Sequence, residues 1–525
     1  MKGTAAVSAT EAIELERKYD VETHVSVPDL SPFGTVVESG AITLRSVYFD
    51  TAGRDLATHR ITLRRRTGGA DEGWHLKLPA GDARIERRVP LGDDAGDAES
   101  VPADLLSPVL AIVRDRELVP IARLITDRSV IRVLNEAGDP VLEFADDRVS
   151  ATDLSTGILR IWREWEVEVV DSAADHTASL DAVERAVLAA GASVSTSASK
   201  VGRATGGARH SAHPAPTADL RSSTALEAGL AILAGHVNSL VRADAAARAD
   251  EPDGVHAMRI AVRRTRAVLA ALRGILVRDE IDPVRDRLRV LGDVLGTVRD
   301  TEVRLSRAAG LLGDVDAYRD SDQGDSAEAD AGHSSLRRRL LDDTQAELSV
   351  VHAEMVGYLS SEEYFRLLDD LEGLLTRPPL GDDAHEPAKE AFRAALRRAA
   401  RRTNRRLTAA RAEDFSDRAA AHAARKAARR LRFIAEAAAS PETRVLGKKA
   451  SRWGVAAHAV QDSLGDLRDT ALFIDHLRLI SAESAEAGEN TAAYDILEER
   501  ERSTGETTLE AVRSASGDFR SARKR

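Results

Sequence analysis

Charged side chains that could bind a metal ion and a phosphate group together lie near the start of the chain, in the run IELERK from Ile13 to Lys18. Apolar and charged residues alternate here, which is typical of a β-strand. Because a strand points alternate side chains to one face, Glu14, Glu16 and Lys18 are expected to share a side. Such a row is usually a solvated strand surface. The strands that follow must decide whether it is a binding site instead.

Rows of like charge recur with the same period of two along the next predicted strands. In the last of these strands, Trp165, Val167 and Val169 are the expected packing face, which leaves three carboxylates on the other side. The rows are Arg64 with Arg66, His75 with Lys77, Arg84 with Arg88, Glu143 with Asp147, and Glu164 with Glu166 and Glu168.

Adjacent carboxylates repel one another unless a cation neutralises them or water surrounds them. Hard divalent cations such as Mg²⁺ and Mn²⁺ favour an oxygen cage of this kind, often completed by phosphate oxygens. Arginine and lysine in turn bind phosphate oxygens. Acidic and basic rows within one domain therefore indicate the chemistry of a metal-dependent polyphosphate hydrolase.

Short strands separated by Gly, Pro and Asp turns are predicted for the first 204 residues. About eight strands in this span favour one sandwich or barrel. Helices are expected over Leu180–Ala190 and within Pro102–Arg116. The predicted strands are Ile13–Tyr19, Ile42–Asp50, Ile61–Thr67, Trp74–Leu78, Ile85–Pro90, Ile121–Asn135, Val141–Ala151 and Ile158–Val170.

The charged rows resemble, in order, the motifs of CYTH domains, the triphosphate tunnel metalloenzymes. The resemblance covers about 190 residues and implies an eight-stranded antiparallel β-barrel whose tunnel binds triphosphate with a divalent metal. The matching motifs are Glu14-x-Glu16-x-Lys18, Leu63-Arg64-Arg65-Arg66, Leu76-Lys77-Leu78-Pro79, Glu86-Arg87-Arg88, Thr126-Asp127-Arg128, Glu143 with Asp147, Glu164-Trp165-Glu166-Val167-Glu168, and Ser199-Lys200 with Arg203.

This resemblance implies a role for each matched residue. Asp147 is preferred to Asp146 because it shares a face with Glu143. For Glu86 and Glu164, pairing with a nearby arginine is an equal alternative to a place in the metal shell, and Arg203 could equally be a surface residue. The implied phosphate contacts are Lys18, Arg64, Arg66, Lys77, Arg128 and Lys200. The implied ligands of Mg²⁺ or Mn²⁺ are Glu14, Glu16, Asp147, Glu166 and Glu168, with Glu86 and Glu164 as further candidates.

A different composition begins after residues 205–219, which read as a linker rich in Gly, His and Pro. Residues 220–502 have the spacing of helices and contain a repeat. The eleven residues from His256 to Arg266 match those from His422 to Arg432 at seven positions. The segments LGTVRDT, from Leu295, and LGDLRDT, from Leu464, also match. These segments are expected to serve helix packing and capping in a duplicated helical bundle.

Each copy of the repeat carries His or Arg at positions i, i+3, i+7 and i+10, which lie within an arc of roughly 80° on a helix. Four basic side chains on one stripe repel one another unless an anion or solvent lies against them. A harmless surface helix is one interpretation, but the recurrence of the stripe favours a binding role. Aromatic residues are scarce nearby, which disfavours base stacking and favours a long anion without bases.

The helical region resembles the CHAD domain, a duplicated all-helical module often found beside CYTH domains. The resemblance covers about residues 222–480 and implies binding of inorganic polyphosphate by a basic surface. The implied contacts are His256, Arg259, Arg263, Arg266, His422, Arg425, Lys426, Arg429 and Arg432.

The whole chain of 525 residues is therefore expected to be an α+β protein of two domains, with a tunnel over residues 1–204 and a helical bundle over residues 220–502. An acidic insertion is predicted at about residues 314–335 and a flexible tail over residues 503–525. No cysteine, signal peptide or membrane span is apparent, so a cytoplasmic protein is expected, with polyphosphate granules as a further location. The net charge of −12 disfavours coating of nucleic acid, and no specific nucleic acid is expected as a partner.

Metal-dependent hydrolysis of inorganic triphosphate, joined to polyphosphate binding, is the leading functional hypothesis. Adenylate cyclase and thiamine triphosphatase remain open, because tunnel enzymes also act on other triphosphates. A non-catalytic protein that binds polyphosphate granules is an alternative of another class. The helical surface could also form a homodimer.

Overall fold

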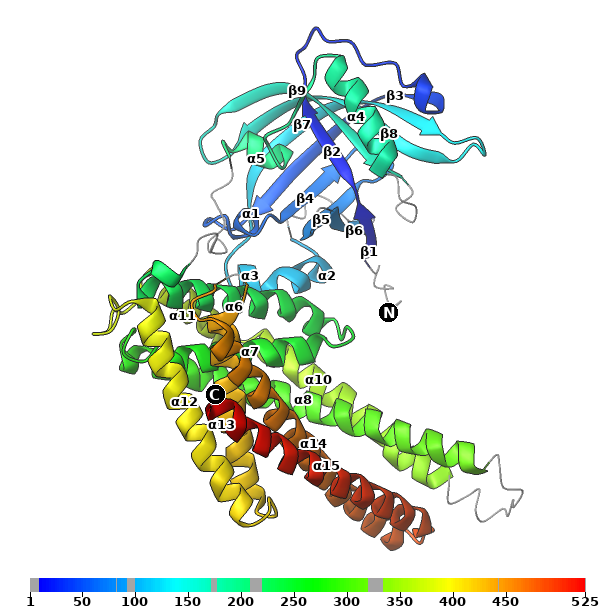
Figure 1. Ribbon diagram of the computed structural model, residues 1–525. Coiled ribbons are helices and arrows are strands. Elements are labelled where there is room, and N and C mark those ends of the chain that lie inside the picture. Colours follow the sequence, from blue (N-terminus) through cyan, green and yellow to red (C-terminus); the bar gives the residue numbers. More distant parts are fainter. Residues whose placement is uncertain are drawn as a thin grey trace. The chain divides into compact units, whose positions relative to one another are not determined.

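The computed structural model describes residues 9–81, 83–91, 100–170, 177–207, 220–319, 334–441 and 443–524. The chain divides into two compact units, Met1–Ala212 and His213–Arg525 (Figure 1). The first unit is a curled sheet with a few short helices, and the second consists of helices. The α+β class predicted from the sequence is confirmed. Within the described residues, no helix is long and apolar enough to span a membrane.

Antiparallel pairing joins all the strands of the N-terminal unit into one sheet of ten strands, with the order β1-β6-β5-β4-β3-β7-β8-β9-β2-β10. The prediction of eight strands is corrected here, because the first predicted strand is broken and β10 is a further strand of two residues. The strands are β1 (Thr10–Glu14), β2 (Glu16–Asp20), β3 (Thr35–Asp50), β4 (Thr62–Thr67), β5 (Gly73–Ala80), β6 (Ala83–Pro90), β7 (Val119–Leu134), β8 (Pro140–Asp153), β9 (Leu159–Val169) and β10 (Ser193–Val194).

The break in the first strand falls at Leu15 and closes the sheet. Strand β1 pairs with β6, where Glu14 lies opposite Arg84, whereas β2 pairs with β9, where Glu16 lies opposite Glu168. Strands near opposite ends of the hydrogen-bonded order are thus joined by a single residue. The sheet therefore curls on itself and has an inner and an outer face (Figure 1).

The outer face of β9 is the packing face predicted from the sequence. Trp165, Val167 and Val169 are buried in one cluster with Tyr19 of β2. Helix α4 (Thr177–Ala189), predicted as Leu180–Ala190, covers this cluster with Leu180, Val183 and Val187. Burying side chains of this size stabilises the fold by about 1.5–3 kcal/mol each. The apolar residues of β9 thus face α4, and the alternate carboxylates are left for the interior of the curled sheet.

The remaining helices of the first unit are short. The helix predicted within Pro102–Arg116 is two separate turns of helix with a 3₁₀ turn between them. The elements are α1 (Asp55–Thr58), α2 (Ala103–Leu106), α3 (Leu110–Val113) and α5 (Lys200–Ala204), with 3₁₀ turns at Ser31–Phe33 and Ser107–Val109.

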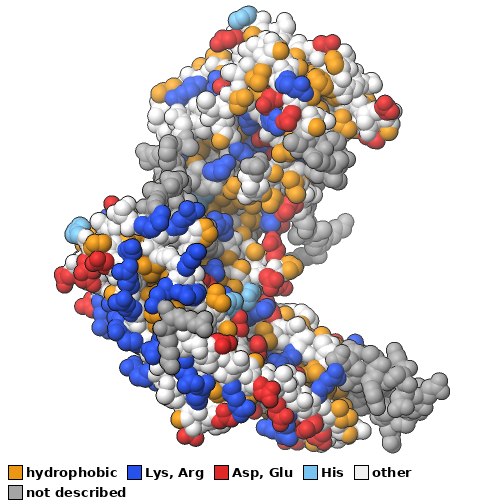
Figure 2. Space-filling view, viewed as in Figure 1, with side chains coloured by type: hydrophobic (Ala, Val, Ile, Leu, Met, Phe, Trp, Pro, Cys, Tyr) orange, Lys and Arg blue, Asp and Glu red, His pale blue; other side chains and the backbone are white. Residues whose placement is uncertain are grey.

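The second unit repeats one arrangement of helices. Helix α7 packs between α6 and α8, and α13 packs between α12 and α14 in the same way. Lys and Arg side chains gather over α12 on the face seen in Figure 2. The helices are α6 (Ala225–Arg248), α7 (Gly254–Ala271), α8 (Arg278–Arg319), α10 (Asp343–Leu359), α11 (Glu362–Thr376), α12 (Ala388–Ala412), α13 (Arg418–Ala439), α14 (Lys448–Glu486) and α15 (Ala492–Lys524), with a π-helical turn at Arg338–Asp342 before α10.

Two predictions about the connecting segments lie largely outside the described residues. Of the predicted linker, residues 208–219 are not described, and of the predicted acidic insertion, residues 320–333 are not described. The expected start of that insertion at residue 314 is corrected, because α8 continues to Arg319.

The expected flexible tail, residues 503–525, is wrong. Residues 503–524 belong to helix α15, and Val512, Ala515 and Phe519 are buried in one core cluster with residues of α12, α13 and α14. The three positions have the spacing i, i+3, i+7 that places side chains on one helical face. A narrow apolar stripe in an otherwise polar segment therefore packs this part of α15 against α12, α13 and α14.

Replacing Phe519 with Ala should destabilise the helical unit by about 3–5 kcal/mol, because the substitution leaves a cavity in this core. The exposed neighbour Arg520 offers a matched control, and Arg520→Ala should change stability by no more than about 0.5 kcal/mol. Denaturant unfolding followed by circular dichroism measures both variants. Equal midpoints for Phe519→Ala and the unchanged chain would contradict the docked helix.

Candidate functional site

A cavity of about 430 Å³ lies inside the curled sheet of the N-terminal unit. Its lining includes all six residues predicted to contact phosphate, namely Lys18, Arg64, Arg66, Lys77, Arg128 and Lys200. It also includes four of the five main candidates for metal binding, namely Glu14, Glu16, Glu166 and Glu168. The fifth, Asp147, is fully buried in the wall, where it contacts Arg128 and Lys200.

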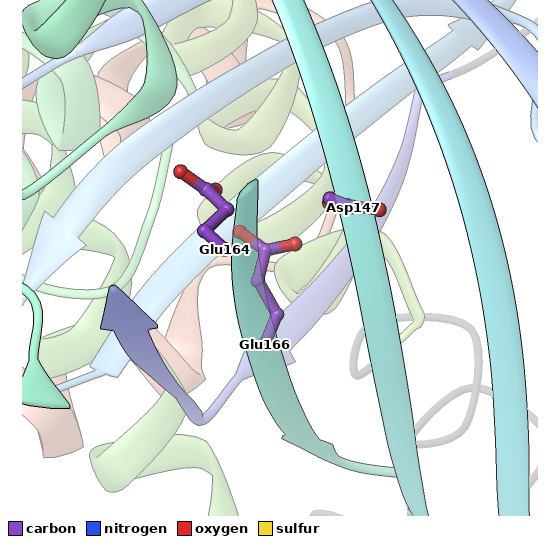
Figure 3. Close-up of side chains that lie close together, drawn as sticks. All are labelled: Asp147, Glu164 and Glu166. Atoms are coloured by element: carbon purple, nitrogen blue, oxygen red, sulfur yellow. The ribbon is translucent and has the colours of Figure 1, made fainter. Parts of the chain in front are cut away.

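Three buried carboxylates converge in the wall of this cavity. Oxygen atoms of Asp147, Glu164 and Glu166 all lie within 4.8 Å of one another (Figure 3). Asp147 comes from β8, and the other two come from alternate positions of the neighbouring strand β9, with Asp147 directly opposite Glu164. Close, buried carboxylate oxygens are the donor set that Mg²⁺ and Mn²⁺ prefer, so these residues fit a divalent metal ion.

The ammonium group of Lys200 lies among the three carboxylates. Its Nζ atom is 2.9 Å from Asp147, 2.7 Å from Glu164 and 2.6 Å from Glu166. Burial alone would lower the pKa of Lys200, but the three carboxylates raise it well above its usual value. Glu164 is thus held by Lys200, and Trp162 also donates a hydrogen bond to it.

Helix α5 positions Lys200 at its first turn. The Ser199 hydroxyl caps this helix by accepting a hydrogen bond from the Gly202 amide at 3.1 Å. Arg203 holds the other end, because it donates to Asp20 of β2 at 2.5 Å and stacks over the Trp162 ring at 5.0 Å. These contacts anchor Arg203 to the sheet, and a role for it in the site stays a prediction.

Glu86 lies behind the cavity wall and pairs with basic side chains. It is fully buried, 3.1 Å from His75 and 3.6 Å from Arg64, and it accepts a hydrogen bond from Arg88. Although burial alone would raise its pKa, His75 and Lys77 hold the pKa of Glu86 well below its usual value. Glu86 is therefore paired with Arg64 and Arg88 in this structure, and its place in a metal shell stays a prediction.

Carboxylates at the β1–β2 break are paired with lysines. Lys77 Nζ is 2.5 Å from Glu14, and Lys18 Nζ is 3.0 Å from Glu16. Burial would raise the pKa of Glu16, but Lys18 and Lys77 lower it to about 2. Glu168, in contrast, has a pKa raised to about 7 by burial and by the neighbouring Glu14.

Guanidinium groups also line the cavity, some of them beside the carboxylates. Arg128 contacts Asp147 with two nitrogens at 2.7 Å and Glu166 at 2.6 Å. Arg66 is 2.5 Å from Asp71, yet burial and the positive charge of Arg64 lower its pKa to about 10. An anion bound between these buried cations would reduce their mutual repulsion.

Several cavity residues were absent from the predicted site. Arg132 and Glu143 form an ion pair of 3.1 Å at the cavity lining, and Asp71 comes from the turn before β5. The period of two had already placed Arg84, Arg88 and Glu143 in charged rows, although no role in the site was assigned to them. Arg132 shares a face with Arg128, so the same period could have found it. Asp71 carries no such signal, because a turn has no periodic pattern.

A second cavity, of about 370 Å³, lies between helices of the two repeats in the C-terminal unit. We call it the helical pocket. His256, Arg259 and Arg263 from the first stripe line it, and Arg425 is the residue of the second stripe that does so. The remaining predicted contacts, Arg266, His422, Lys426, Arg429 and Arg432, do not line this pocket.

The two Leu-Gly segments belong to this pocket, which corrects their assignment to packing and capping alone. Arg299 and Asp300 of the first segment and Arg468 and Asp469 of the second all line it. Sequence analysis overlooked them because only the stripes were considered as candidate ligands. The signal for these four residues is that the Leu-Gly segments are duplicated in the sequence along with the basic stripes.

Each glycine of these segments makes room for one arginine of a stripe. A Cβ atom at Gly296 would lie 3.6 Å from Arg259 Nη2, and one at Gly465 would lie 3.0 Å from Arg425 Nη2. The two contacts are equivalent under the duplication. They bring guanidinium groups of α7 and α13 close together, so that burial and neighbouring arginines lower the pKa of Arg263 to about 8 and that of Arg429 to about 10.

A model of the CYTH domain matches residues 12–204, and a model of the CHAD domain matches residues 231–478. The chain is a CYTH–CHAD protein. The uncharacterized protein Rv2226 of Mycobacterium tuberculosis is 36% identical over 525 residues, which cover 96% of this chain and 95% of that protein. Both families identified from the motifs are thereby confirmed.

Two solved structures resemble the CYTH–CHAD chain in part. The CHAD domain from the plant Ricinus communis is 22% identical, covers 58% of this chain and 95% of its own, and has a TM-score of 0.45. PptA from Streptomyces chartreusis is 18% identical, covers 58% of this chain and 100% of its own, and has a TM-score of 0.41. The family assignment rests on the family models and the mycobacterial relative.

CYTH domains are those of triphosphate tunnel enzymes, which act on triphosphate substrates and depend on a metal. The N-terminal unit of this chain therefore belongs to a group of enzymes that act on phosphoanhydrides. The residues that contact substrate and metal in this chain remain predictions based on the geometry above.

A methyl group at Gly465 should displace the Arg425 side chain from the helical pocket, because the new Cβ atom would lie 3.0 Å from it. Gly357, in helix α10, is the matched control, since a Cβ atom there meets nothing within 4 Å. Gly357→Ala should raise stability by about 0.5–1 kcal/mol through helix propensity. Gly465→Ala should not raise the stability in this way, and thermal unfolding of both variants measures the difference. An equal gain at both positions would show that Arg425 needs no space at Gly465.

Proposed function

We propose that the N-terminal domain hydrolyses inorganic triphosphate with Mg²⁺ or Mn²⁺. The observation that carries this proposal is the convergence of Asp147, Glu164 and Glu166 beside a cavity whose lining includes nine Lys or Arg side chains. The carboxylates would hold the metal ion, together with Glu14, Glu16 and Glu168 at the β1–β2 break. When bound, the metal ion would supply a Lewis acid that activates water and neutralises phosphate charge.

The residues of the chain would bind and orient the substrate. Arg64, Arg66 and Arg128, with Lys18, Lys77 and Lys200, would hold phosphate oxygens in the cavity that all six line. Each of these cations except Arg64 has a contact with a carboxylate at 3.0 Å or less. A bound triphosphate would therefore take over contacts that acidic side chains make in its absence, and the released carboxylates would be free for metal.

Inorganic triphosphate is preferred to nucleotide substrates because the cavity lining is dominated by charged side chains. Its aromatic member is Tyr48, whose neighbour Arg64 is a phosphate candidate. A base or thiazole ring would need an apolar or stacking surface, which this lining offers sparingly. ATP and thiamine triphosphate are therefore test substrates rather than the proposed ones.

Purified protein should release phosphate from triphosphate with Mg²⁺ or Mn²⁺, and a chelator should abolish the release. Glu166→Gln should lower the rate by about 100-fold or more, because it removes a charged oxygen from the converging carboxylates. Glu11→Gln is the control, since Glu11 pairs with Arg87 outside the cavity lining. Parallel incubations contain ATP, thiamine triphosphate and long polyphosphate. Faster turnover of ATP or thiamine triphosphate would reassign the substrate, and no turnover at all would favour a binding protein.

We further propose that the helical domain binds inorganic polyphosphate in the helical pocket. Arginines from both repeats face one cavity, and burial together with neighbouring arginines lowers the pKa values of Arg263 and Arg425. A chain of phosphates without bases would relieve this repulsion at several positions at once. A location at polyphosphate granules would follow from this binding.

Polyphosphate binding should weaken by about tenfold or more in the double variant Arg259→Ala with Arg425→Ala, because each arginine contributes a charged hydrogen bond. Arg366→Ala with Arg478→Ala is the control, since both residues form exposed ion pairs away from this pocket. Titration with labelled polyphosphate at several salt concentrations measures the affinity. Unchanged binding by the pocket variant would show that the stripes are not the site.

A further inference from the structure

The turn between β4 and β5, residues 68–72, brings to the cavity of the N-terminal unit a carboxylate that the proposed function does not use. Ala70 and Asp71 of this turn both line the cavity. Asp71 is not one of the three carboxylates that converge in the wall. The other carboxylates of the lining lie on strands and are Glu14, Glu16, Glu143, Glu166 and Glu168. Its separate position suits Asp71 for a role other than metal binding.

The backbone of this turn is held in one conformation. Gly68 and Gly69 have φ angles of +83° and +88°, a region that residues with a side chain rarely adopt. A Cβ atom at Gly68 would lie 2.4 Å from the Thr43 carbonyl oxygen, so the turn lies directly against β3. Glu72 accepts a hydrogen bond from the Gly68 amide at 3.2 Å. These contacts fix the position from which the Asp71 side chain extends.

His75 anchors Asp71 through the main chain. The His75 ring is buried in β5, with Nε2 2.9 Å from the Asp71 carbonyl oxygen and Nδ1 3.1 Å from Glu86. A hydrogen bond to the carbonyl group holds the backbone of Asp71 but leaves its side chain free to rotate. The Asp71 carboxylate can therefore leave its partner while the turn stays in place.

Arg66 is the partner of the Asp71 carboxylate. Asp71 Oδ2 lies 2.5 Å from Arg66 Nη1, and the Arg66 side chain is buried. Within the described residues, the buried Nε atom of Arg66 has no hydrogen-bond partner. The contact with Asp71 thus leaves one donor of the guanidinium group unsatisfied. A phosphate group can accept two parallel hydrogen bonds from an arginine, so it suits Arg66 better than Asp71 does.

Asp71 and a phosphate ligand therefore compete for one guanidinium group. A ligand that takes Arg66 must break the Arg66–Asp71 contact, which weakens its binding. Triphosphate offsets this loss at the other basic side chains that line the cavity, whereas orthophosphate is too short to contact them all. Diphosphate, formed by hydrolysis, makes fewer contacts than triphosphate. The return of Asp71 to Arg66 would therefore help diphosphate to leave.

We propose that Asp71 competes with phosphate chains for Arg66 and so limits how tightly the cavity retains substrate and product. This inference rests on the proposed hydrolysis of inorganic triphosphate. Asp71 is then a specificity-determining residue and not a catalytic one, since its carboxylate has left Arg66 when the substrate is bound. Such a competitor weakens the binding of substrate and transition state alike, and it therefore acts on KM rather than on kcat.

The test measures the release of phosphate from triphosphate by the full chain, with diphosphate as an inhibitor. Asp71→Asn removes the charge and keeps the size of the side chain. It should lower the KM for triphosphate and the inhibition constant of diphosphate by the same factor, about tenfold, because Arg66 loses a charged hydrogen-bond partner. The kcat should stay unchanged or fall, since the product leaves more slowly.

Glu72→Gln is the matched control. It changes the charge equally at the neighbouring residue, and Glu72 does not line the cavity. The control should change neither constant by more than about twofold. A KM that rises or stays unchanged in Asp71→Asn would overturn the proposal.

The same substitution in an Arg66→Gln background separates competition from the general effect of a charge near an anion. Asp71→Asn should lower the KM only when Arg66 is present, because the competition is for that side chain. An equal fall in KM in both backgrounds would overturn the proposal. Calorimetric titration with triphosphate in a chelator makes the same comparison through dissociation constants, without hydrolysis.

Failure of the proposed function is recognised separately. Tighter binding of triphosphate by Asp71→Asn, with no turnover by the unchanged chain, would support the competition and reject the hydrolase. Turnover with an unchanged KM in Asp71→Asn would reject the competition alone. A chain that neither binds nor hydrolyses triphosphate would overturn both.

Discussion

Buried charge in the N-terminal domain is tolerated because every buried carboxylate of the cavity wall has a cation near it. Lys200 is the clearest case, since a single ammonium group lies within 2.9 Å of Asp147, Glu164 and Glu166. Removing charges from water costs several kcal/mol per ion unless they are paired in good geometry. The fold therefore depends on bringing α5, at the end of the domain, back against β8 and β9. The site that we propose for metal and triphosphate is thus stabilised by lysines and arginines of the chain itself.

In the helical domain, by contrast, the charged side chains around the pocket do not neutralise one another. Around its pocket the arginines outnumber the carboxylates, and Asp300 and Asp469 neutralise them only in part. Gly296 and Gly465 intensify this repulsion by letting Arg259 and Arg425 approach the facing helices. One domain thus compensates its charges internally, whereas the other leaves an excess that an anion can compensate. Duplication explains how such an unfavourable arrangement is built, because one helical stripe is used twice around a shared centre.

Periodicity revealed most of the candidate site before the structure was known. In β9 the period of two separates Glu166 from its apolar neighbours, in β4 it puts Arg64 and Arg66 on one face, and all three line the cavity. The period of two does not predict the break at Leu15. Glu14 and Glu16 would face the same side in an unbroken strand, and in the structure both line the cavity. Helix α15 was mistaken for a tail because its apolar stripe is narrow. Asp71 and the pairing of Glu86 with His75 depend on contacts between strands, which a single strand pattern does not contain.

The break at Leu15 also sets an order for biosynthesis. Strand β1 finds its partner in β6, about 75 residues downstream by register, whereas β2 pairs with β9 at residues 164–168. As the chain leaves the ribosome, β1 can pair long before β2 has a partner. The residues of β2, Glu16–Asp20, must therefore wait, with their charges in water, until β9, β10 and the lysine of α5 have been made. Closure of the tunnel and neutralisation of its acidic wall are then late events of folding, and a nascent chain that stops before residue 200 carries an open sheet with an uncompensated wall.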